Sequence, residues 1–153
     1  MNDNTIVAVI GAGACPDAVA ARAREVGRRL AEAGYVVICG GLGGVMKAAC
    51  QGATEAGGLT IGVLPGDSAE AANPHVTIPI VTGMGAARNV IVVRSAQAVI
   101  AVDGGPGTLS EIAHCLQFGV PVFGLGSWDI PGVEQVDSPE GAVSKAVAIA
   151  RKR

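Results

Sequence analysis

Short runs of β-branched and apolar residues alternate with segments of helical periodicity along most of the chain. The apolar runs cover residues 5–10, 35–39, 59–64, 76–81, 98–102 and 122–125. The helical patterns cover residues 16–33, 45–56, 108–118 and 138–153. Strands that alternate with helices form βαβ units, and their right-handed crossovers place helices on both faces of a parallel sheet. The sequence therefore predicts an α/β fold with a doubly wound, mostly parallel sheet, a Rossmann-like three-layer sandwich.

Two segments need more than periodicity to interpret. Pro79 lies in the run 76–81 and cannot donate a ladder hydrogen bond, so this strand is expected at an edge or an end of the sheet. Residues 90–93 have the β-propensity of a strand, but residues 85–87 before them and 94–97 after them also allow a helix. We interpret residues 86–95 as a helix.

Length and composition restrict the class of protein. The 153 residues match one ordinary domain, so we expect a single Rossmann-like nucleotide-binding or phosphate-binding domain over residues 1–153. Half of the residues are hydrophobic and 16% are charged, which excludes a disordered chain. A net charge of −2 and an aromatic content of 3% argue against a basic face or a stacking platform for nucleic acid. We therefore expect no nucleic-acid partner.

The termini and the cysteines bear on location and redox state. Apolar runs are shorter than the ~20 residues needed to cross a bilayer, and residues 1–4 lack the positive start of a signal peptide. We expect a cytoplasmic protein without a membrane partner. The cysteines form no C-x-x-C pair, so we expect buried reduced thiols and no metal site or disulfide. They are Cys15, Cys39, Cys50 and Cys115.

Glycine is concentrated in three stretches, residues 11–13, 40–44 and 104–107, each between a predicted strand and the next helix. Any one of them could serve only as a tight turn. In a parallel sheet, however, all three emerge at the carboxyl edge, where helix N-termini present unpaired N–H groups and positive dipole ends. Glycine lets a phosphate approach the backbone, so together the loops predict a site for a small phosphorylated ligand. The candidate binding residues are Gly11, Gly13, Gly40, Gly41, Gly44, Gly104, Gly105 and Gly107.

Two common phosphate-binding motifs are absent. The first loop, Gly11-x-Gly13-x-x-Pro16, lacks the third glycine or alanine of the dinucleotide fingerprint. The second strand ends in Cys39 and two glycines instead of the acidic residue that binds the ribose of NAD. No G-x-x-x-x-G-K-[ST] occurs either, so NAD binding and a Walker-type ATPase are both disfavoured.

Few ionisable residues lie near this edge, and each has two interpretations. Glu111 stands at a capping-box spacing from Thr108, but its carboxylate could instead face the crevice. Arg88 could bind a phosphate through two hydrogen bonds or lie on the surface. Asp103 could bind a ribose hydroxyl or merely end a strand, and His114 is expected to pack or cap.

Three stretches resemble a known family. Residues 103–111, DGGPGTLSE, resemble the P-G-G-x-G-T-x-x-E motif of the Lonely Guy cytokinin-activating phosphoribohydrolases, a family long mislabelled as "possible lysine decarboxylase". Residues 84–89 resemble that family's M-x-x-R-K segment with one inserted residue, and residues 40–46 resemble its glycine-rich G-G-G-x-x-G-L-M loop, which ends here at Met46. Within this superfamily, the sequence Ala87-Arg88-Asn89 before a valine-rich segment is more similar to molybdenum-cofactor carrier proteins.

The resemblance implies two functions. The carrier branch implies a binding protein for a phosphorylated nucleotide or a pterin-type cofactor, with the molybdenum cofactor as a candidate ligand and no required cofactor. The alternative is a nucleoside 5′-monophosphate phosphoribohydrolase, for which the resemblance assigns Arg88 and Glu111 to catalysis. For the hydrolase, the resemblance also assigns the 5′-phosphate to Gly104, Gly105, Gly107 and Thr108. Met46 and Asp103 complete the candidate binding residues. The resemblance also implies a homo-oligomer, a dimer or larger, and leaves open whether the protein is an enzyme.

Two departures from the family motifs affect these expectations. Asn89 replaces the lysine, and Asp103 replaces the proline. Two anions 4 Å apart repel by about 4 kcal/mol at an effective dielectric constant of roughly 20. We therefore expect Asp103 to point away from a bound phosphate or to contact ribose or a metal.

Overall fold

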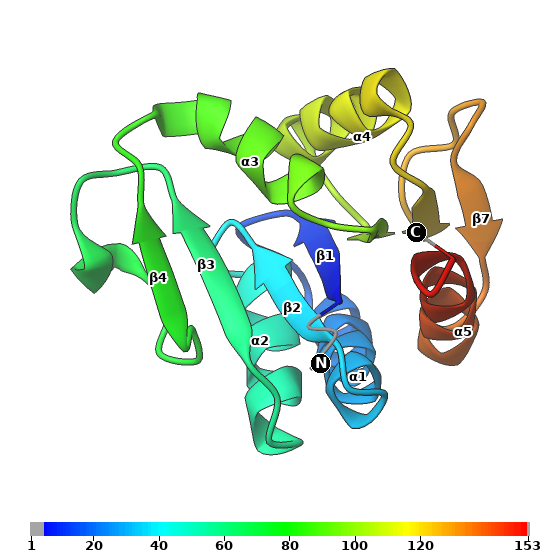
Figure 1. The fold of residues 1–153 in the computed structure, drawn as a ribbon, viewed down its shortest axis with the longest axis horizontal. Coiled ribbons are helices and arrows are strands. Elements are labelled where there is room, and N and C mark those ends of the chain that lie inside the picture. Colours follow the sequence, from blue (N-terminus) through cyan, green and yellow to red (C-terminus); the bar gives the residue numbers. More distant parts are fainter. Residues whose placement is uncertain (1–4, 153) are drawn as a thin grey trace.

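A computed structural model describes residues 5–152 and contains a seven-stranded sheet in the order β4-β3-β2-β1-β5-β6-β7 (Figure 1). Every pair of neighbouring strands is parallel. The strands are β1 (Ile6–Gly11), β2 (Val36–Cys39), β3 (Thr60–Leu64), β4 (Ile78–Val81), β5 (Ala98–Val102), β6 (Val122–Leu125) and β7 (Glu134–Val136). The helices are α1 (Asp17–Glu32), α2 (Val45–Glu55), α3 (Arg88–Arg94), α4 (Pro106–Phe118) and α5 (Pro139–Ala150), with 3-10 turns η1 (Ala69–Ala71) and η2 (Gly85–Ala87). This arrangement confirms the predicted α/β fold.

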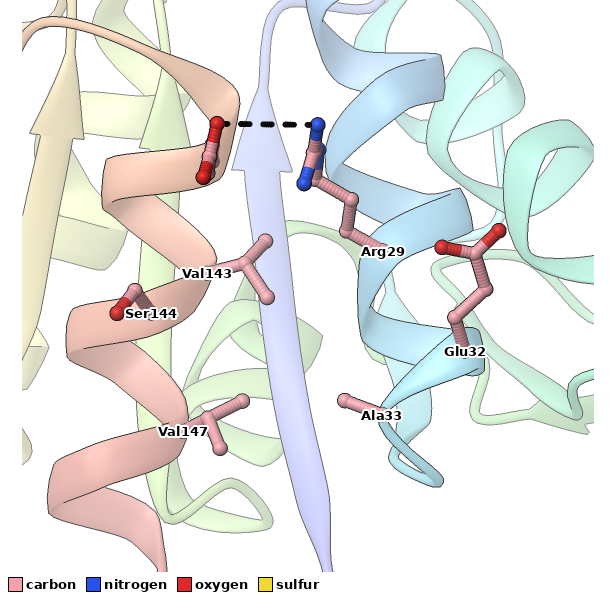
Figure 2. A pocket seen from close by; sticks show the side chains of 7 residues that line it. Arg29, Glu32, Ala33, Val143, Ser144 and Val147 are labelled. Atoms are coloured by element: carbon pink, nitrogen blue, oxygen red, sulfur yellow. Dashed lines mark ion pairs between the residues drawn. The ribbon is translucent and has the colours of Figure 1, made fainter.

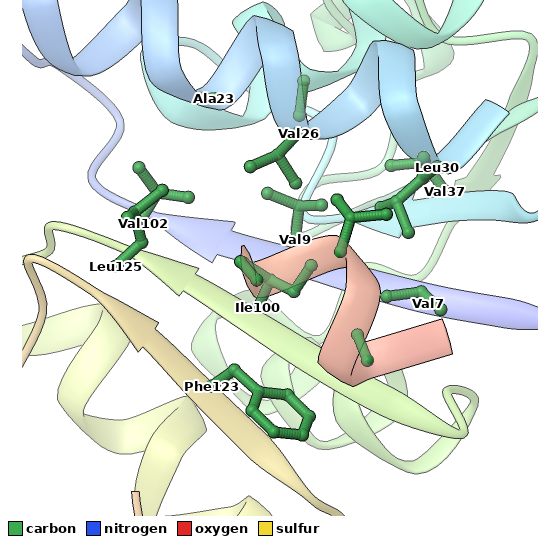
Figure 3. Packing of buried hydrophobic residues seen from close by; sticks show 14 of the residues in the cluster. Val7, Val9, Ala23, Val26, Leu30, Val37, Ile100, Val102, Phe123 and Leu125 are labelled. Atoms are coloured by element: carbon green, nitrogen blue, oxygen red, sulfur yellow. The ribbon is translucent and has the colours of Figure 1, made fainter. Parts of the chain in front are cut away.

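Helices cover both faces of the sheet, with α1, α2 and α5 on one face and α3 and α4 on the other (Figure 1). The side chains of β1 show why. Val7 and Val9 pack among the first group of helices, as Figure 3 shows beneath α1. Ala8 and Ile10 pack under α3 and α4. Successive side chains of a strand point to opposite faces, so this apolar run is buried on both sides, as a parallel sheet requires.

Helices α1 and α2 approach each other through two glycines. A Cβ atom placed on Gly52 would lie 1.9 Å from the carbonyl oxygen of Arg24, and one placed on Gly27 would lie 2.0 Å from that of Ala49. Neither distance is compatible with a side chain. The two helix backbones therefore touch directly along the middle and later turns of α1 and α2.

Several elements differ from the sequence expectations. Strand β7 was not predicted, because it has three residues and Glu134 and Gln135 are exposed. Helix α4 begins at Pro106 rather than Thr108, since proline is well suited to the first helical position. The segment interpreted as a helix is confirmed as η2 followed by α3. Strand β4, which contains Pro79, lies at the edge of the sheet as predicted, and all four of its residues are exposed.

Three of the four thiols are buried, those of Cys39, Cys50 and Cys115, while Cys15 is partly exposed. The Sγ atoms of Cys39 and Cys50 lie 3.4 Å apart, within hydrogen-bond range. Within residues 5–152, no helix has the length and apolar character to cross a membrane.

Candidate functional site

The site lies where the order of the sheet reverses. From β1 the chain proceeds outward through β2, β3 and β4, and it then returns to place β5 on the other side of β1. The loops that follow β1 and β5 therefore turn to opposite faces and leave a crevice between them, the usual ligand position in open α/β sheets. Because β2 is the other neighbour of β1, all three glycine-rich loops converge at this carboxyl edge, as expected.

A cavity of about 320 Å³ occupies this crevice. Its volume is within the range of about 300–1,000 Å³ that is typical of small-molecule sites. The lining comes from the loops after β1, β2 and β5 and from the starts of α2, α3 and α4. It consists of Gly11, Ala12, Gly13, Leu42, Met46, Arg88, Asn89, Gly105, Pro106, Gly107, Thr108 and Glu111.

Eight of the thirteen predicted site residues line the cavity, and five do not. Those that line it are Gly11, Gly13, Met46, Arg88, Gly105, Gly107, Thr108 and Glu111. Those that do not are Gly40, Gly41, Gly44, Asp103 and Gly104. Four lining residues were not among the predicted ones, namely Ala12, Leu42, Asn89 and Pro106.

The glycines outside the lining hold the loops together. Gly44 has a φ of 59°, and a Cβ there would lie 2.2 Å from the carbonyl oxygen of Ala12. That same oxygen accepts a hydrogen bond of 3.0 Å from the backbone N–H of Val45. At Gly40, a Cβ would lie 2.6 Å from Nη2 of Arg88. These glycines support the site through close packing and not through direct exposure to the cavity.

Two glycines that line the cavity have no such packing reason. A Cβ on Gly105 or Gly107 would meet no protein atom within 4 Å, apart from chain neighbours and the backbone of its own helix. Neither has a positive φ. The fold therefore has space for a side chain at both positions, and that space is open to a ligand that approaches the start of α4.

Arg88 is buried, with 8% of its surface exposed, so the interpretation as a surface residue is wrong. Its Nε donates to the carbonyl oxygen of Val63 at 2.8 Å, its Nη2 to that of Gly40 at 3.4 Å, and its Nη1 to Oδ1 of Asn89. A guanidinium has five N–H groups, so these three bonds leave two for a ligand. Burial lowers the pKa of Arg88, and the negative charge of Glu111 opposes that shift.

Asn89 connects this arginine to α4. Its Oδ1 accepts from Arg88, and its Nδ2 donates to Oγ of Ser110 at 3.2 Å. Ser110 donates in turn to the carbonyl oxygen of Gly107 at 2.8 Å. Asn89 thus orients the guanidinium, a role whose only sequence signal was its position next to Arg88.

Glu111 faces the cavity and is 7% exposed. Burial raises the pKa of its carboxyl to about 7, although the charge of Arg88 lowers it. The capping-box interpretation is wrong, because α4 begins at Pro106 and its N-cap is Gly105. Thr108 is the third helical residue and cannot cap the helix.

Thr108 has a buried hydroxyl without a partner. The residue is 2% exposed, and its Oγ1 forms no hydrogen bond within residues 5–152. An unsatisfied buried hydroxyl costs about 1–3 kcal/mol. Gly104, with a φ of 129°, leaves room for the Thr108 side chain, because a Cβ there would lie 2.6 Å from Cβ of Thr108. The fold therefore places a polar group in the cavity wall that a ligand oxygen could satisfy.

Asp103 lies outside the cavity lining. It has a φ of 51°, in the left-handed region that aspartate tolerates better than most residues. Its negative charge contributes, after burial, to the raised pKa of Cys15. His114 stacks on Phe118 with 5.8 Å between ring centroids, which confirms that it packs.

A second cavity, of about 350 Å³, lies between α1 and α5 (Figure 2). An ion pair crosses it, with 3.9 Å between Nη2 of Arg29 and Oε2 of Glu140, and Val143 and Val147 line its α5 side. None of the predicted site residues lines it. Among residues 5–152, no three His, Cys, Asp or Glu side chains are grouped so that they could hold a metal ion.

Several known proteins are similar to this chain in sequence or in fold. An uncharacterized protein from Archaeoglobus fulgidus is 44% identical over 143 residues, which cover 93% of this chain and 94% of the relative. The structure of the molybdenum cofactor binding protein from Rippkaea orientalis matches with a TM-score of 0.91 and 37% identity, over 95% of this chain and 97% of that one. The Moco carrier protein from Chlamydomonas reinhardtii matches with a TM-score of 0.88 and 35% identity, over 98% and 99% of the two chains.

These relatives confirm the expected similarity to molybdenum-cofactor carrier proteins, whereas the relationship to the Lonely Guy enzymes stays a prediction. A sequence profile of the SLOG cluster4 family matches residues 4–151, almost the complete chain. The chain therefore belongs to the SLOG cluster4 family.

Proposed function

We propose that this protein is a carrier-type binding protein whose ligand is a phosphorylated nucleotide or a pterin-type cofactor, with the molybdenum cofactor as one candidate. The observation that carries the proposal is the unpartnered hydroxyl of Thr108 in the cavity wall, beside open space at Gly105 and Gly107. The names of the two structural relatives, a molybdenum cofactor binding protein and a Moco carrier protein, support the same class of ligand.

The start of α4 is the proposed phosphate position. The first N–H groups of this 13-residue helix have no partner within the helix, and the helix dipole favours an anion there. A phosphate oxygen at this position would also accept a hydrogen bond from the Thr108 hydroxyl. The free N–H groups of Arg88 would bind a second oxygen or another polar group of the ligand.

A glycine substitution tests the proposal. Alanine at Gly107 should fold normally, because it meets no neighbouring atom within 4 Å and favours a helix more than glycine does. Its methyl group would occupy the proposed phosphate space. The wild type should show a raised melting temperature with millimolar AMP, GMP or phosphate, since a ligand of the native state stabilises it by RT ln(1 + [L]/Kd). Gly107→Ala should lose most of this shift.

Gly66→Ala is the matched control. Gly66 is exposed, has no positive φ and has open space around its Cβ position, but it does not line the cavity. This variant should keep the wild-type shift. An equal shift in Gly107→Ala and in the wild type would contradict the phosphate position.

A second candidate, a nucleoside 5′-monophosphate phosphoribohydrolase, is favoured by one specific observation. Glu111 combines a cavity position with a pKa of about 7, so at neutral pH both protonation states of its carboxyl are populated. Such a carboxyl can donate or accept a proton, or stabilise an oxocarbenium-like transition state as the N-glycosidic bond breaks. Arg88 would hold the phosphate or the ribose during this step.

Release of free base distinguishes the two functions. The purified protein would be incubated with AMP, GMP, CMP and UMP, with Glu111→Ala as the control. Release above that control supports the hydrolase. Ligand binding without release supports the carrier.

We also propose that the protein forms a homo-oligomer and acts in the cytoplasm without a nucleic-acid partner. The exposed apolar side chains of β4, Ile78, Ile80 and Val81, support an association between subunits. Light scattering after size-exclusion chromatography measures the mass, and a monomer would contradict the oligomer.

A further inference from the structure

Trp128 is the single tryptophan of the chain and is 40% exposed next to the cavity. Its indole N–H donates to the carbonyl oxygen of Gly105 at 3.2 Å. Gly105 is the N-cap of α4 and lines the cavity. The indole is therefore fixed at the residue that begins the proposed phosphate position.

The main chain of Trp128 is held as well. Its carbonyl oxygen accepts a hydrogen bond of 3.0 Å from Nε2 of Gln135, which lies on β7. This explains what the short seventh strand contributes to the site. With its side chain bound to α4 and its backbone bound to β7, Trp128 loses little additional freedom when a ligand binds, which favours affinity.

Packing of the protein does not account for this ring. Trp128 belongs to neither large core cluster, although buried tryptophan is among the strongest contributors to a core. A large ring that is exposed, held by a hydrogen bond at its N–H and adjacent to a cavity has the properties of a binding surface. The same loop contains Ser127, whose buried Oγ has no hydrogen-bond partner among residues 5–152.

The position of Trp128 complements that of Arg88. Arg88 binds carbonyl oxygens of β3 and of the loop after β2, on one side of the central strand β1. Trp128 follows β6, two strands away on the other side of β1. A ligand with its phosphate at the start of α4 thus has a cationic group on one side and an aromatic ring on the other.

We propose that Trp128 stacks on an aromatic heterocycle of the ligand, so that the site prefers phosphate monoesters of purine or pterin compounds over inorganic phosphate and sugar phosphates. The inference rests on the proposed phosphate position and adds the residue that recognises the ring. Stacking of one base on an aromatic side chain corresponds to about a 5- to 150-fold change in affinity.

Calorimetry and fluorescence on the full chain test this inference with GMP, neopterin phosphate and ribose 5-phosphate, the last of which lacks the ring. The two ring compounds should quench the Trp128 fluorescence of the wild type, and ribose 5-phosphate should not. Trp128→Ala should lower the affinity for GMP and for neopterin phosphate by about 5- to 150-fold. Its affinity for ribose 5-phosphate should equal that of the wild type. Trp128→Phe, which keeps a ring, should recover most of the affinity.

Leu59→Ala is the control for loss of an exposed apolar side chain, because Leu59 is 46% exposed and precedes β3 at the opposite, amino edge of the sheet. Its affinities should equal those of the wild type. The stacking role of Trp128 would be refuted if Trp128→Ala bound GMP and neopterin phosphate as tightly as the wild type, or if it lost the same affinity for all three ligands. Either result would leave the proposed phosphate position intact. If the wild type binds none of the three ligands, the phosphate site itself is refuted.

Discussion

The buried carboxyl of Glu111 should make the stability of this protein depend on pH in a way that one substitution removes. Its pKa is about 7 in the folded protein, against an ordinary value of 4.5 that applies in the unfolded chain. Below pH 4.5 both states hold the proton and the carboxyl contributes its full stability. Between pH 4.5 and 7 the unfolded chain loses this proton while burial keeps it on the folded protein, so that stability falls progressively and is gone once the pH has passed 7.

The magnitude follows from the difference between the two pKa values. Each unit corresponds to about 1.4 kcal/mol, so the difference between about 7 and 4.5 corresponds to about 3 kcal/mol of unfolding free energy. The opposing effect of Arg88 is already contained in this value. Glu111→Gln preserves the shape of the side chain and removes the titration. Compared with the wild type, the variant should gain about 3 kcal/mol of relative stability between pH 4 and pH 8.

Urea unfolding at half-unit pH steps provides the assay, with fluorescence of Trp128 as the signal. The difference between variant and wild type is the informative quantity, since all other titrating groups are shared. Glu70→Gln removes a carboxylate from the exposed turn η1 and controls for the change in net charge. A difference for Glu111→Gln that stays constant between pH 4 and pH 8 would refute the reasoning that burial controls this carboxyl.

Two further predictions concern packing and thiol reactivity. Gly52→Ala should destabilise the protein by about 1–3 kcal/mol in urea unfolding, because the new methyl group would lie 1.9 Å from the carbonyl oxygen of Arg24. Helix propensity alone predicts the opposite sign, so increased stability would contradict the direct contact of α1 and α2. In the native protein, DTNB should react first at Cys15, and the other three thiols should react only after unfolding. Burial and the charges of Asp103 and Asp17 raise the pKa of Cys15, so its labelling should become faster up to and beyond pH 9, and Cys15→Ser should abolish the early phase.

Much of the fold could be predicted because its signals are local. The alternation of apolar runs and helical patterns indicated six of the strands and four of the helices, and Pro79 indicated the edge position of β4. Helix α3 was interpreted correctly, although its valine-rich segment also had the propensity of a strand. The missing strand, β7, has three residues and forms only because β6 offers a free edge. A strand that depends on its neighbour has no periodicity of its own to detect.

The candidate site was predictable in part. The glycine-rich loops and the motif at residues 103–111 indicated the edge of the sheet where the cavity lies, although the roles of these residues in binding or catalysis stay predictions. Local sequence could not show that Arg88 is buried, because its hydrogen-bond acceptors Val63 and Gly40 are 25 and 48 residues away. Nor could it distinguish a capping Glu111 from one that faces the cavity, since that choice depends on a two-residue difference in the start of α4.

The sequence by itself determined the order of the strands and helices along the chain, and hence a parallel sheet whose glycine-rich loops meet at its carboxyl edge. Only the tertiary structure decided which glycines open to the cavity and which support it. Gly44 against Ala12 and Gly40 against Arg88 are contacts between distant parts of the chain. Such contacts, like the burial that raises the pKa of Glu111, come from packing of the complete fold and have no local pattern.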